Sequence, residues 1–346
     1  MKYFTGTDAG LDLKEVNSVI QKAFADNGNG LVQMPPKMYV SLPQGDFRTM
    51  PAYLPSLGIA GVKIVNVHPD NPARGLPTVM ALIMILDIPT GKPEAIINAT
   101  HLTDMRTGAA GSIACKYLSG KKEVILGLIG TGRQAQAQVA AIGEEISING
   151  IRVWSRNPLH AEKFSTSIKG IECHSSTIER ACDCDVLVTT TPSKDPIVMS
   201  SMVHEGTHIN AIGADAPGKE ELDPVLLTRA SVFVDDMAQA VHSGEINVPI
   251  KKGLFYKENI AGTLGEVVIG KKSANTPKRS RSLMQQALQS RTLRLQRSQC
   301  CTERPSCCHF PELYIKKEKP FIRVFLQIFS RPVHGIPDHC CTCRMG

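Results

Sequence analysis

The sequence predicts an α/β protein in which a Rossmann doubly wound parallel sheet is joined to an α+β domain. From Lys121 onward, short apolar strands alternate with helical segments, and the strands are EVILGLIG, GIRVWSR, CDVLVTTTP, HINAIGA and SVFVDD. Strands that helices separate in this way form parallel sheets. A glycine-rich turn also follows the first of these strands directly. Together the two observations predict a Rossmann domain over residues 121–265.

The first 120 residues have a different pattern. Short apolar runs such as GVKIVNV at 61–67 and TVMALIMIL at 78–86 alternate with glycine and proline. This pattern predicts a mostly antiparallel sheet with flanking helices. Because the 346 residues exceed the usual size of one domain, we expect a separate domain over 1–120 and a C-terminal segment over 266–346.

Positive charge and cysteine are concentrated at the end of the chain. Residues 271–346 hold 15 Lys and Arg against 4 Asp and Glu, whereas residues 1–270 hold 24 against 28. Seven of the 11 cysteines lie between Cys300 and Cys343. The body therefore has the composition of a reduced, cytoplasmic protein that does not bind nucleic acid. No stretch approaches the roughly 20 apolar residues that span a bilayer, and the opening MKYFTGTDAG lacks a signal sequence, so we expect no membrane partner.

The glycine-rich turn is the strongest local signal. It has the form G-x-G-x-x-A, in which Gly130 permits a tight turn, Gly132 lets the backbone approach a pyrophosphate, and Ala135 lets the helix pack on the strand. A plain glycine turn is the alternative. The apolar strand before it and the alanine-rich segment after it favour dinucleotide binding.

The second strand, GIRVWSR, ends in Ser155 and Arg156. An NAD-specific site usually places a carboxylate there to hold the ribose hydroxyls. A hydroxyl and a guanidinium suit a 2′-phosphate instead, so the sequence favours NADP over NAD. The alternative is that Arg156 is an ordinary surface arginine.

Lys63 interrupts the apolar run around Val62, Ile64 and Val65. A buried ammonium is costly unless it is paired or its pKa is lowered for proton transfer. The alternative is an alternating strand whose Lys63 faces water, and the residues alone favour that alternative.

Arg106 follows Leu102-Thr103-Asp104-Met105 and precedes the small-residue segment TGAAGSIA. We expect it in the first turn of a helix that Thr103 or Asp104 caps. There it can bind a carboxylate with help from the helix dipole. A surface arginine is the alternative.

Asp215 ends the segment HINAIGAD and precedes Ala216-Pro217-Gly218-Lys219. Because ligands of open α/β sheets bind at the carboxyl ends of strands, we expect its carboxylate to face the cofactor. A turn residue without a function is the alternative. We expect no metal, because no metal-ligand spacing is present among His68, His204, His208 and His242.

Four separated motifs resemble, in the right order, the ornithine cyclodeaminase, mu-crystallin and archaeal-type alanine dehydrogenase family. They are GVKIVNVHPDNPARGLPTV, LTDMRTGAAGSIACKYL, GLIGTGRQAQAQ and INAIGADAPGKEELD, and the resemblance covers about residues 1–272. It implies that the N-terminal domain, with returning C-terminal elements, binds the substrate and forms a homodimer. The Rossmann domain would bind NADP or NAD.

The resemblance also implies roles for individual residues. Lys63 and Arg106 would bind the substrate carboxylate, and Lys63 and Asp215 would be the candidate proton carriers. Lys37 and Arg48 fall where family members line the substrate pocket. The cofactor would contact Arg106, Thr107, Gly130, Gly132, Gln134, Ala135, Ser155, Arg156, Asn157, Thr190, Gly213, Ala214 and Asp215.

Arg48 separates the possible activities. Cyclodeaminases place a glutamate at this position to hold the distal ammonium of ornithine, and a cation there would repel that ammonium. We therefore expect an NAD(P)-dependent oxidoreductase of small L-amino acids that converts L-alanine reversibly to pyruvate and ammonia. The alternatives are an ornithine cyclodeaminase, a cyclic ketimine reductase, and a non-catalytic NADP(H)-binding protein like mu-crystallin.

The sequence departs from the family after GEVVIGKK, where members continue with a segment like D-A-T-G-L-A-I-Q-D-V-A. A nucleotide string that encodes Met284 to Arg294 spells this segment when it is translated in another reading frame. We therefore expect that a frameshift near residue 275 replaced the native C-terminus. The rival interpretation is a metal-binding or nucleic-acid-binding tail, but its adjacent Cys-Cys pairs do not match C-x-x-C spacing.

Overall fold

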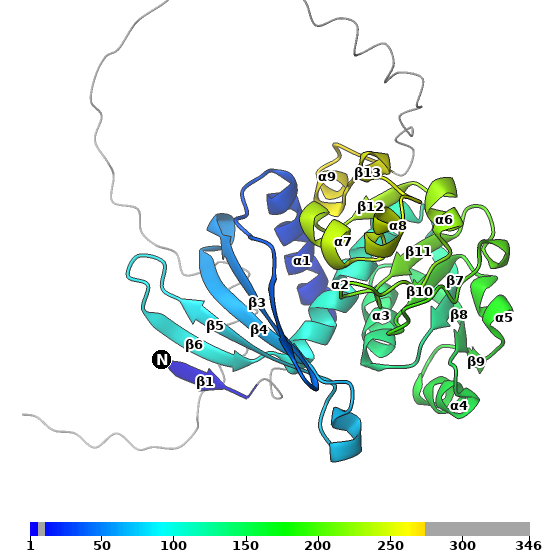
Figure 1. Ribbon diagram of the computed structural model, residues 1–346, viewed down its shortest axis with the longest axis horizontal. Coiled ribbons are helices and arrows are strands. Elements are labelled where there is room, and N and C mark those ends of the chain that lie inside the picture. Colours follow the sequence, from blue (N-terminus) through cyan, green and yellow to red (C-terminus); the bar gives the residue numbers. More distant parts are fainter. Residues whose placement is uncertain (6–10, 274–346) are drawn as a thin grey trace, which may run out of the picture.

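The computed structural model describes residues 1–5 and 11–273, which form two main sheets with helices α1 (Leu13–Gly28) and α2 (Thr100–Leu118) between them (Figure 1). The predicted fold class is confirmed, because a mixed α+β part precedes a parallel Rossmann sheet. The expected frameshifted tail lies outside the described residues. No helix among the described residues is long and apolar enough to cross a membrane.

The first sheet is built from the N-terminal hundred residues. Its strand order is β1-β6-β5-β4-β3-β2; β1 runs parallel to β6 and every other pair is antiparallel, as the sequence predicted. Its strands are β1 (Lys2–Phe4), β2 (Met38–Leu42), β3 (Gly45–Leu54), β4 (Ile59–Val67), β5 (Val79–Leu86) and β6 (Pro93–Asn98).

The two faces of this sheet have different surroundings. Val65 and Ala81 are buried on the inner face, where they form a core with Ala99. The alternate residues of the strands point the other way, and Leu82 on this outer face is 38% exposed. Each strand contributes apolar residues to the outer face, which also carries the polar Thr49, Asn66 and Asn98. Its apolar residues include Tyr3, Met38, Val40, Phe47, Ile64, Leu82 and Ile96.

The second sheet is parallel throughout, with strand order β11-β10-β7-β8-β9, which is the first five-strand portion of a Rossmann order. Its strands are β7 (Glu123–Ile129), β8 (Ser147–Trp154), β9 (Cys173–Ser175), β10 (Val186–Thr189) and β11 (His208–Ala211). The helices of this part are α3 (Arg133–Gly143), α4 (Pro158–Ser167), α5 (Ile178–Cys182) and α6 (Pro224–Arg229).

The expectation that SVFVDD joins this parallel sheet is wrong. The strand β12 (Val232–Val234) pairs with β13 (Ile260–Thr263) in a separate two-stranded parallel sheet. Apolar periodicity indicates that a segment is a strand, but the hydrogen-bond partner depends on the distant β13. The remaining helices are α7 (Met237–Ser243), α8 (Asn247–Lys251) and α9 (Leu264–Val268).

Helix α2 joins the two sheets. It packs against β5 of the first sheet and against β11 and α3 of the second. The approach to α3 is close, because a Cβ on Gly108 would lie 2.5 Å from the carbonyl oxygen of Ala137. This packing fixes Thr107 beside α3, where its carbonyl accepts a hydrogen bond from Gln138 Nε2 at 2.9 Å. Helix α9 returns to pack on α1 near the start of the chain.

Candidate active site

The glycine-rich turn leaves an open space at the first turn of α3. Gly130 has a φ of 111°, and a Cβ there would lie 2.5 Å from the hydroxyl of Thr190, so a side chain does not fit. Gly132 caps α3, and nothing lies within 4 Å of where its Cβ would be. Ala135 is fully buried against the strands. An open space in front of free backbone N–H groups suits a pyrophosphate.

A cavity of about 410 Å³ lies at the carboxyl ends of β8 and β9, and β8 is the neighbour of the strand β7 that precedes this turn. Ser155 lines the cavity, whereas Arg156 is exposed and Asn157 accepts a hydrogen bond from the Leu159 backbone as the cap of α4. The residues that line it are Trp154, Ser155, Pro158, Ala161, Ser175, Ser176, Thr177, Ile178 and Glu179.

Lys63 projects from the inner face of β4, the face that also carries the buried Val65. Burial lowers the pKa of the Lys63 ammonium well below its ordinary value, and the charges of Arg106, Lys37 and Arg48 lower it further. The expected alternative, in which Lys63 faces water, does not describe this structure. Four cations converge here from two strands, one loop and one helix.

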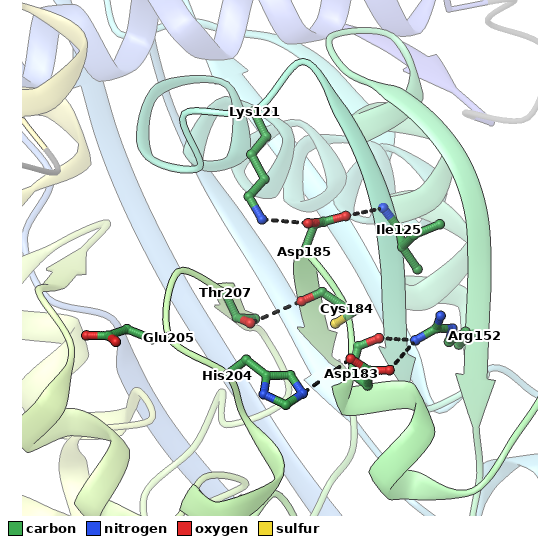
Figure 2. A pocket seen from close by; sticks show the side chains of 9 residues that line it. All are labelled: Lys121, Ile125, Arg152, Asp183, Cys184, Asp185, His204, Glu205 and Thr207. Atoms are coloured by element: carbon green, nitrogen blue, oxygen red, sulfur yellow. Dashed lines mark hydrogen bonds and ion pairs between the residues drawn. The ribbon is translucent and has the colours of Figure 1, made fainter.

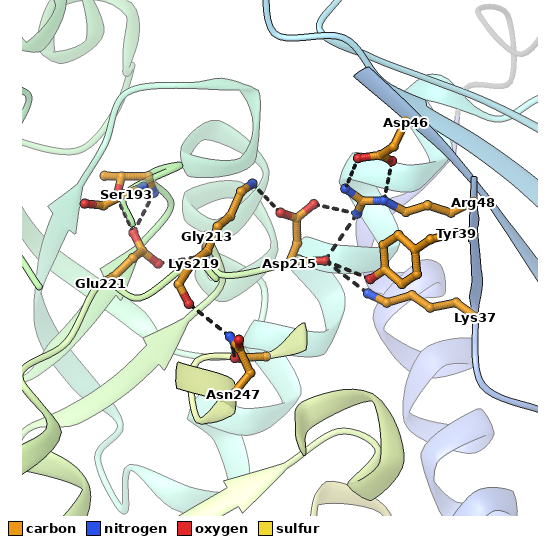
Figure 3. A network of polar contacts seen from close by, with 12 residues as sticks. Lys37, Tyr39, Asp46, Arg48, Ser193, Gly213, Asp215, Lys219, Glu221 and Asn247 are labelled. Carbon is orange, nitrogen blue, oxygen red and sulfur yellow. Dashed lines mark hydrogen bonds and ion pairs between the residues drawn. The ribbon is translucent and has the colours of Figure 1, made fainter. Parts of the chain in front are cut away.

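Asp215 lies at the centre of a polar network that joins the two sheets (Figure 3). Its carboxylate accepts hydrogen bonds from Arg48 Nη1 at 2.9 Å and Lys219 Nζ at 2.5 Å. Its backbone carbonyl accepts from Lys37 Nζ at 3.1 Å and from the Tyr39 hydroxyl at 3.4 Å. The loop after β11 is therefore bound to strands β2 and β3 and to the segment before them.

The charges around Asp215 keep it ionised. Burial alone would raise the pKa of its carboxyl, but the charges and hydrogen bonds of Lys219 and Arg48 outweigh burial and hold this pKa below its ordinary value. Burial likewise opposes the charge of Arg48, while two hydrogen bonds to Asp46, at 2.7 and 3.1 Å, and the charge of Asp215 raise its pKa. The Arg48 guanidinium thus forms ion pairs with two carboxylates of this chain, those of Asp46 and Asp215.

The expected environment of Arg106 needs a correction. Helix α2 begins at Thr100 with Ala99 as its cap, so Arg106 lies in the second turn and neither Thr103 nor Asp104 caps the helix. The helix starts early because the Asn98 side chain accepts a hydrogen bond from the Thr100 backbone at 3.2 Å. Part of the Arg106 side chain reaches solvent, while the protein atoms around its guanidinium lower its pKa against the charges of Asp235 and Asp104.

Asp104, also on α2, contacts helix α3. It forms an ion pair with Arg133 and accepts a hydrogen bond from Gln134 Nε2 at 2.7 Å, so it binds α2 to the first turn of α3. The expected cofactor residues Thr190, Gly213 and Ala214 lie beyond the carboxyl ends of β10 and β11. The structure therefore gathers the expected cofactor residues along one edge of the parallel sheet.

Sequence reasoning missed several side chains of the network. Tyr39 stands opposite Arg48 in the β2–β3 pair, and its ring lies 5.6 Å from the ring of His242, to which we had given no role. Asp46 lies two residues before Arg48 on the same face of β3. The sequence of the hairpin KMYVSLPQGDFR could have indicated these residues. Polar and apolar residues alternate in it, so pairing of its two strands places the polar side chains together on one face of the sheet.

A second polar pocket, of about 290 Å³, lies at the opposite edge of the parallel sheet (Figure 2). There Asp185 pairs with Lys121 at 2.5 Å and accepts from the Ile125 backbone at 2.8 Å, while Asp183 pairs with Arg152 at 3.0 Å. These charges neutralise one another and fasten the amino ends of the strands. No group of three or more His, Cys, Asp or Glu in the described ranges could hold a metal ion.

A Rossmann sheet with an open phosphate turn, facing a second sheet that contributes a set of cations, defines a dinucleotide-binding protein with a separate substrate-facing part. The chain belongs to the ornithine cyclodeaminase/mu-crystallin family, whose model matches residues 2–283. The resemblance inferred from the four motifs is therefore confirmed.

Known relatives agree with this assignment. The alanine dehydrogenase of Archaeoglobus fulgidus is 46% identical over 264 residues, which cover 76% of this chain and 81% of that protein. Among solved structures, an archaeal alanine dehydrogenase dimer with bound NAD is 43% identical with a TM-score of 0.77 and covers 80% of this chain and 88% of its own. The Δ1-pyrroline-2-carboxylate reductase of Thermococcus litoralis, in complex with NADH and L-proline, has 32% identity, a TM-score of 0.77, and coverage of 81% and 90%.

Proposed function

We propose that this chain is an NAD(P)-dependent oxidoreductase of small L-amino acids that interconverts L-alanine with pyruvate and ammonia. One observation carries the proposal: Lys63 lies on the inner face of β4, the face that also carries Arg48, and burial together with the charges of Arg106, Lys37 and Arg48 lowers its pKa. Two adjacent cations suit the carboxylate of an amino acid, and a lysine of lowered pKa suits proton transfer near neutral pH. The similarity to the A. fulgidus alanine dehydrogenase supports this substrate class.

The two candidate proton carriers have different roles in this proposal. Asp215 is held as a carboxylate by Arg48 and Lys219, so it is a weak proton acceptor at neutral pH. Lys63 therefore carries the proton. In the oxidative direction its neutral amine removes a proton from the water that attacks the imine and returns a proton to the departing ammonia. Arg106 orients the carboxylate, and Arg48 and Lys37 act by holding the Asp215 loop.

The described residues fit a dinucleotide. The space above Gly132, the positive φ of Gly130 and the cavity at Ser155 follow one another along the sheet edge. When bound, the cofactor supplies the hydride acceptor or donor at Cα. We assign the pyrophosphate to Gly130, Gly132, Gln134 and Ala135, the adenosine ribose to Ser155, Arg156 and Asn157, and the nicotinamide side to Arg106, Thr107, Thr190, Gly213, Ala214 and Asp215.

The residues at the end of β8 favour NADP over NAD. No Asp or Glu follows this strand to bind the ribose hydroxyls, and the exposed Arg156 can approach a 2′-phosphate. The related structures that hold NAD or NADH favour the other cofactor. A comparison of the two nucleotides therefore belongs in the first experiment.

A second candidate activity is reduction of a cyclic ketimine, which the similarity to the T. litoralis reductase favours. It uses the same site in the reductive direction. Ornithine cyclisation is disfavoured, because Arg48 and Lys37 present cations where the distal ammonium would lie. A non-catalytic binding protein would not need Lys63, Arg106 and Asp215 together.

We also propose that the chain forms a homodimer through the outer face of the first sheet. A sheet face to which each of six strands contributes apolar residues is unusual on a monomer in water. The archaeal alanine dehydrogenase structure is a dimer, which supports the same arrangement here.

The four cysteines of the described residues are free thiols, which fits a cytoplasmic location.

The test follows nicotinamide absorbance with the purified chain. NADH and NADPH are offered in parallel with pyruvate plus ammonia and with a cyclic ketimine, and the oxidised forms are offered with L-alanine. L-Ornithine with NAD is followed by product analysis, because cyclisation returns the hydride to the product and leaves the absorbance unchanged. We expect oxidation that requires both pyruvate and ammonia. The same panel is run with the C-terminus restored to the alternative reading frame, so that loss of activity through the altered tail is separated from a wrong substrate.

A further inference from the structure

A buried glutamate that the catalytic proposal does not use lies behind the Asp215 loop. Glu221, which Figure 3 labels, is fully buried, and its carboxylate accepts four hydrogen bonds. Oε1 accepts from the Thr191 backbone N–H at 2.6 Å and from the Thr191 hydroxyl at 2.7 Å. Oε2 accepts from the Gly213 N–H at 2.8 Å and from the Thr189 hydroxyl at 2.7 Å.

These four donors come from two loops that begin at neighbouring strands. Thr189 ends β10 and Thr191 follows it, while Gly213 lies two residues beyond β11. Gly213 is also tightly enclosed, because a Cβ there would lie 2.5 Å from the Thr191 nitrogen. The Glu221 carboxylate therefore fixes the distance between the ends of β10 and β11, where the loops that carry Thr190 and Asp215 start.

Two further side chains hold the same segment downstream of Asp215. Asn247 accepts a hydrogen bond from the Gly218 N–H at 2.9 Å and donates one to the Lys219 carbonyl at 3.0 Å. Glu245 accepts hydrogen bonds from the N–H groups of Glu221 and Leu222, at 2.8 and 2.6 Å. The segment is thus anchored at residue 213 and again at residues 218–222, and residues 214–217 project toward the first sheet.

We propose that Glu221 is a positioning residue for the reaction: its carboxylate sets the place of the Gly213–Asp215 turn and of Thr190 relative to the nicotinamide side of the site. This inference rests on the proposed function. Glu221 touches neither the substrate nor the proton that is transferred, and it acts through the backbone of residues 191 and 213.

The hydrogen-bond pattern explains why only a carboxylate serves at this position. Each oxygen receives one backbone N–H, and a backbone N–H cannot act as an acceptor. In Glu221→Gln the side-chain amide would face the N–H of Thr191 or that of Gly213, whichever way it turned. One of the two loops would lose its anchor although the side chain keeps its shape.

Glu220 provides a matched control. It is adjacent in sequence and fully buried. Within residues 1–5 and 11–273, its carboxylate pairs with Lys252 alone, at 3.2 Å, and its second oxygen has no hydrogen-bond partner. Glu220→Gln therefore makes the same chemical change at an equally buried position without touching either loop.

The experiment measures amide hydrogen exchange of Thr191 and Gly213, ADP-ribose affinity, and steady-state kinetics in both variants of the full chain. We expect Glu221→Gln to expose one of the two amides to faster exchange and to lower kcat by about 100-fold, because a displacement of about 1 Å costs that much. We expect ADP-ribose affinity to change far less than kcat, since most of the phosphate turn and the whole cavity lie at β7, β8 and β9. Glu220→Gln leaves all three readings as in the parent chain.

The inference is overturned if Glu221→Gln leaves both amides as protected as in the parent, or if Glu220→Gln causes the same loss of kcat. Hydrogen exchange needs no substrate, so it decides the role of Glu221 in the fold even if the parent chain turns over none of the offered substrates. If the parent chain shows no turnover in the kinetic assay, that result counts against the proposed function. It does not affect the conclusion from hydrogen exchange.

Discussion

Arg48 Nη1 lies 2.9 Å from Asp215 Oδ2, although the two residues are 167 positions apart and belong to different parts of the fold. Arg48 also donates to the Asp215 backbone carbonyl at 3.2 Å. The ion pair connects β3 of the first sheet to the loop that follows β11. A residue expected to line the substrate pocket therefore holds the two halves of the site together.

This ion pair should contribute measurably to stability. In a double-mutant cycle with Arg48→Met and Asp215→Asn, we expect a coupling free energy of roughly 0.5–3 kcal/mol. We expect a value in the lower half, because the Asp215 side chain is 43% exposed and water screens the pair. Urea unfolding of the four proteins measures the coupling. Additive effects of the two substitutions would show that the contact has no energetic role.

Lys63 should lower stability while it supports catalysis. Its folded-state pKa lies below that of the unfolded chain, so the unfolded state binds more protons and stability rises with pH up to the ordinary value of 10.5. Removing the ammonium in Lys63→Met should therefore raise the free energy of unfolding at pH 7. We expect kcat to fall by about 100- to 10,000-fold, as for loss of a general acid–base group.

Lys63→Arg is the control for this prediction, because arginine keeps the positive charge and does not release it near neutral pH. We expect it to be as inactive as Lys63→Met and to lack the gain in stability. An active Lys63→Arg would mean that the charge of Lys63, and not proton transfer, is what the reaction needs.

Glu245 should give the stability a dependence on pH. Burial, the largest cause, and the charges of Glu221 and Glu220 raise its pKa to about 8 from an ordinary 4.5, against the backbone hydrogen bonds. Between these values the folded state binds more protons than the unfolded state, so this group makes stability fall as pH rises from about 4.5 to about 8. Glu245→Gln should remove that part of the decrease.

Glutamine suits this position, because Glu245 Oε1 accepts both backbone hydrogen bonds and Oε2 has no partner in the part of the chain that the structure describes. Chemical denaturation at pH 4 and pH 8 compares the two proteins. We expect the free energy of unfolding of the parent to fall between these pH values by more than that of the variant. An equal fall in both proteins would show that the pKa of Glu245 is not raised in the folded state.

The outer face of the first sheet should control the oligomeric state. Leu82 is 38% exposed on this face, in a strand at the middle of the sheet, and Leu82→Lys would place an ammonium in the proposed interface. We expect this variant to be monomeric by light scattering under conditions where the parent is a dimer. Leu159→Lys, at a 61% exposed leucine on α4, should leave the dimer intact. A dimeric Leu82→Lys would place the interface elsewhere.

Local pattern was enough to predict the fold class and much of the site edge. The G-x-G-x-x-A turn and the strand–helix alternation depend on neighbouring residues, and both appear where the sequence indicated. The partner of β12, the start of α2 and the ion pair of Arg48 depend on segments far away in the chain. Glu221 was missed for the same reason, since its four donors become neighbours only after β10 and β11 pair.

The most direct test of the central proposal follows the hydride itself. The chain is incubated with pyruvate, ammonia and NADH or NADPH that carries deuterium at the transferable position, and the amino-acid product is analysed by mass spectrometry. Transfer to the imine carbon predicts L-alanine with one deuterium at Cα. Alanine without deuterium, or no alanine from a chain whose C-terminus has been restored and which binds the dinucleotide, would contradict the assignment as an amino-acid dehydrogenase.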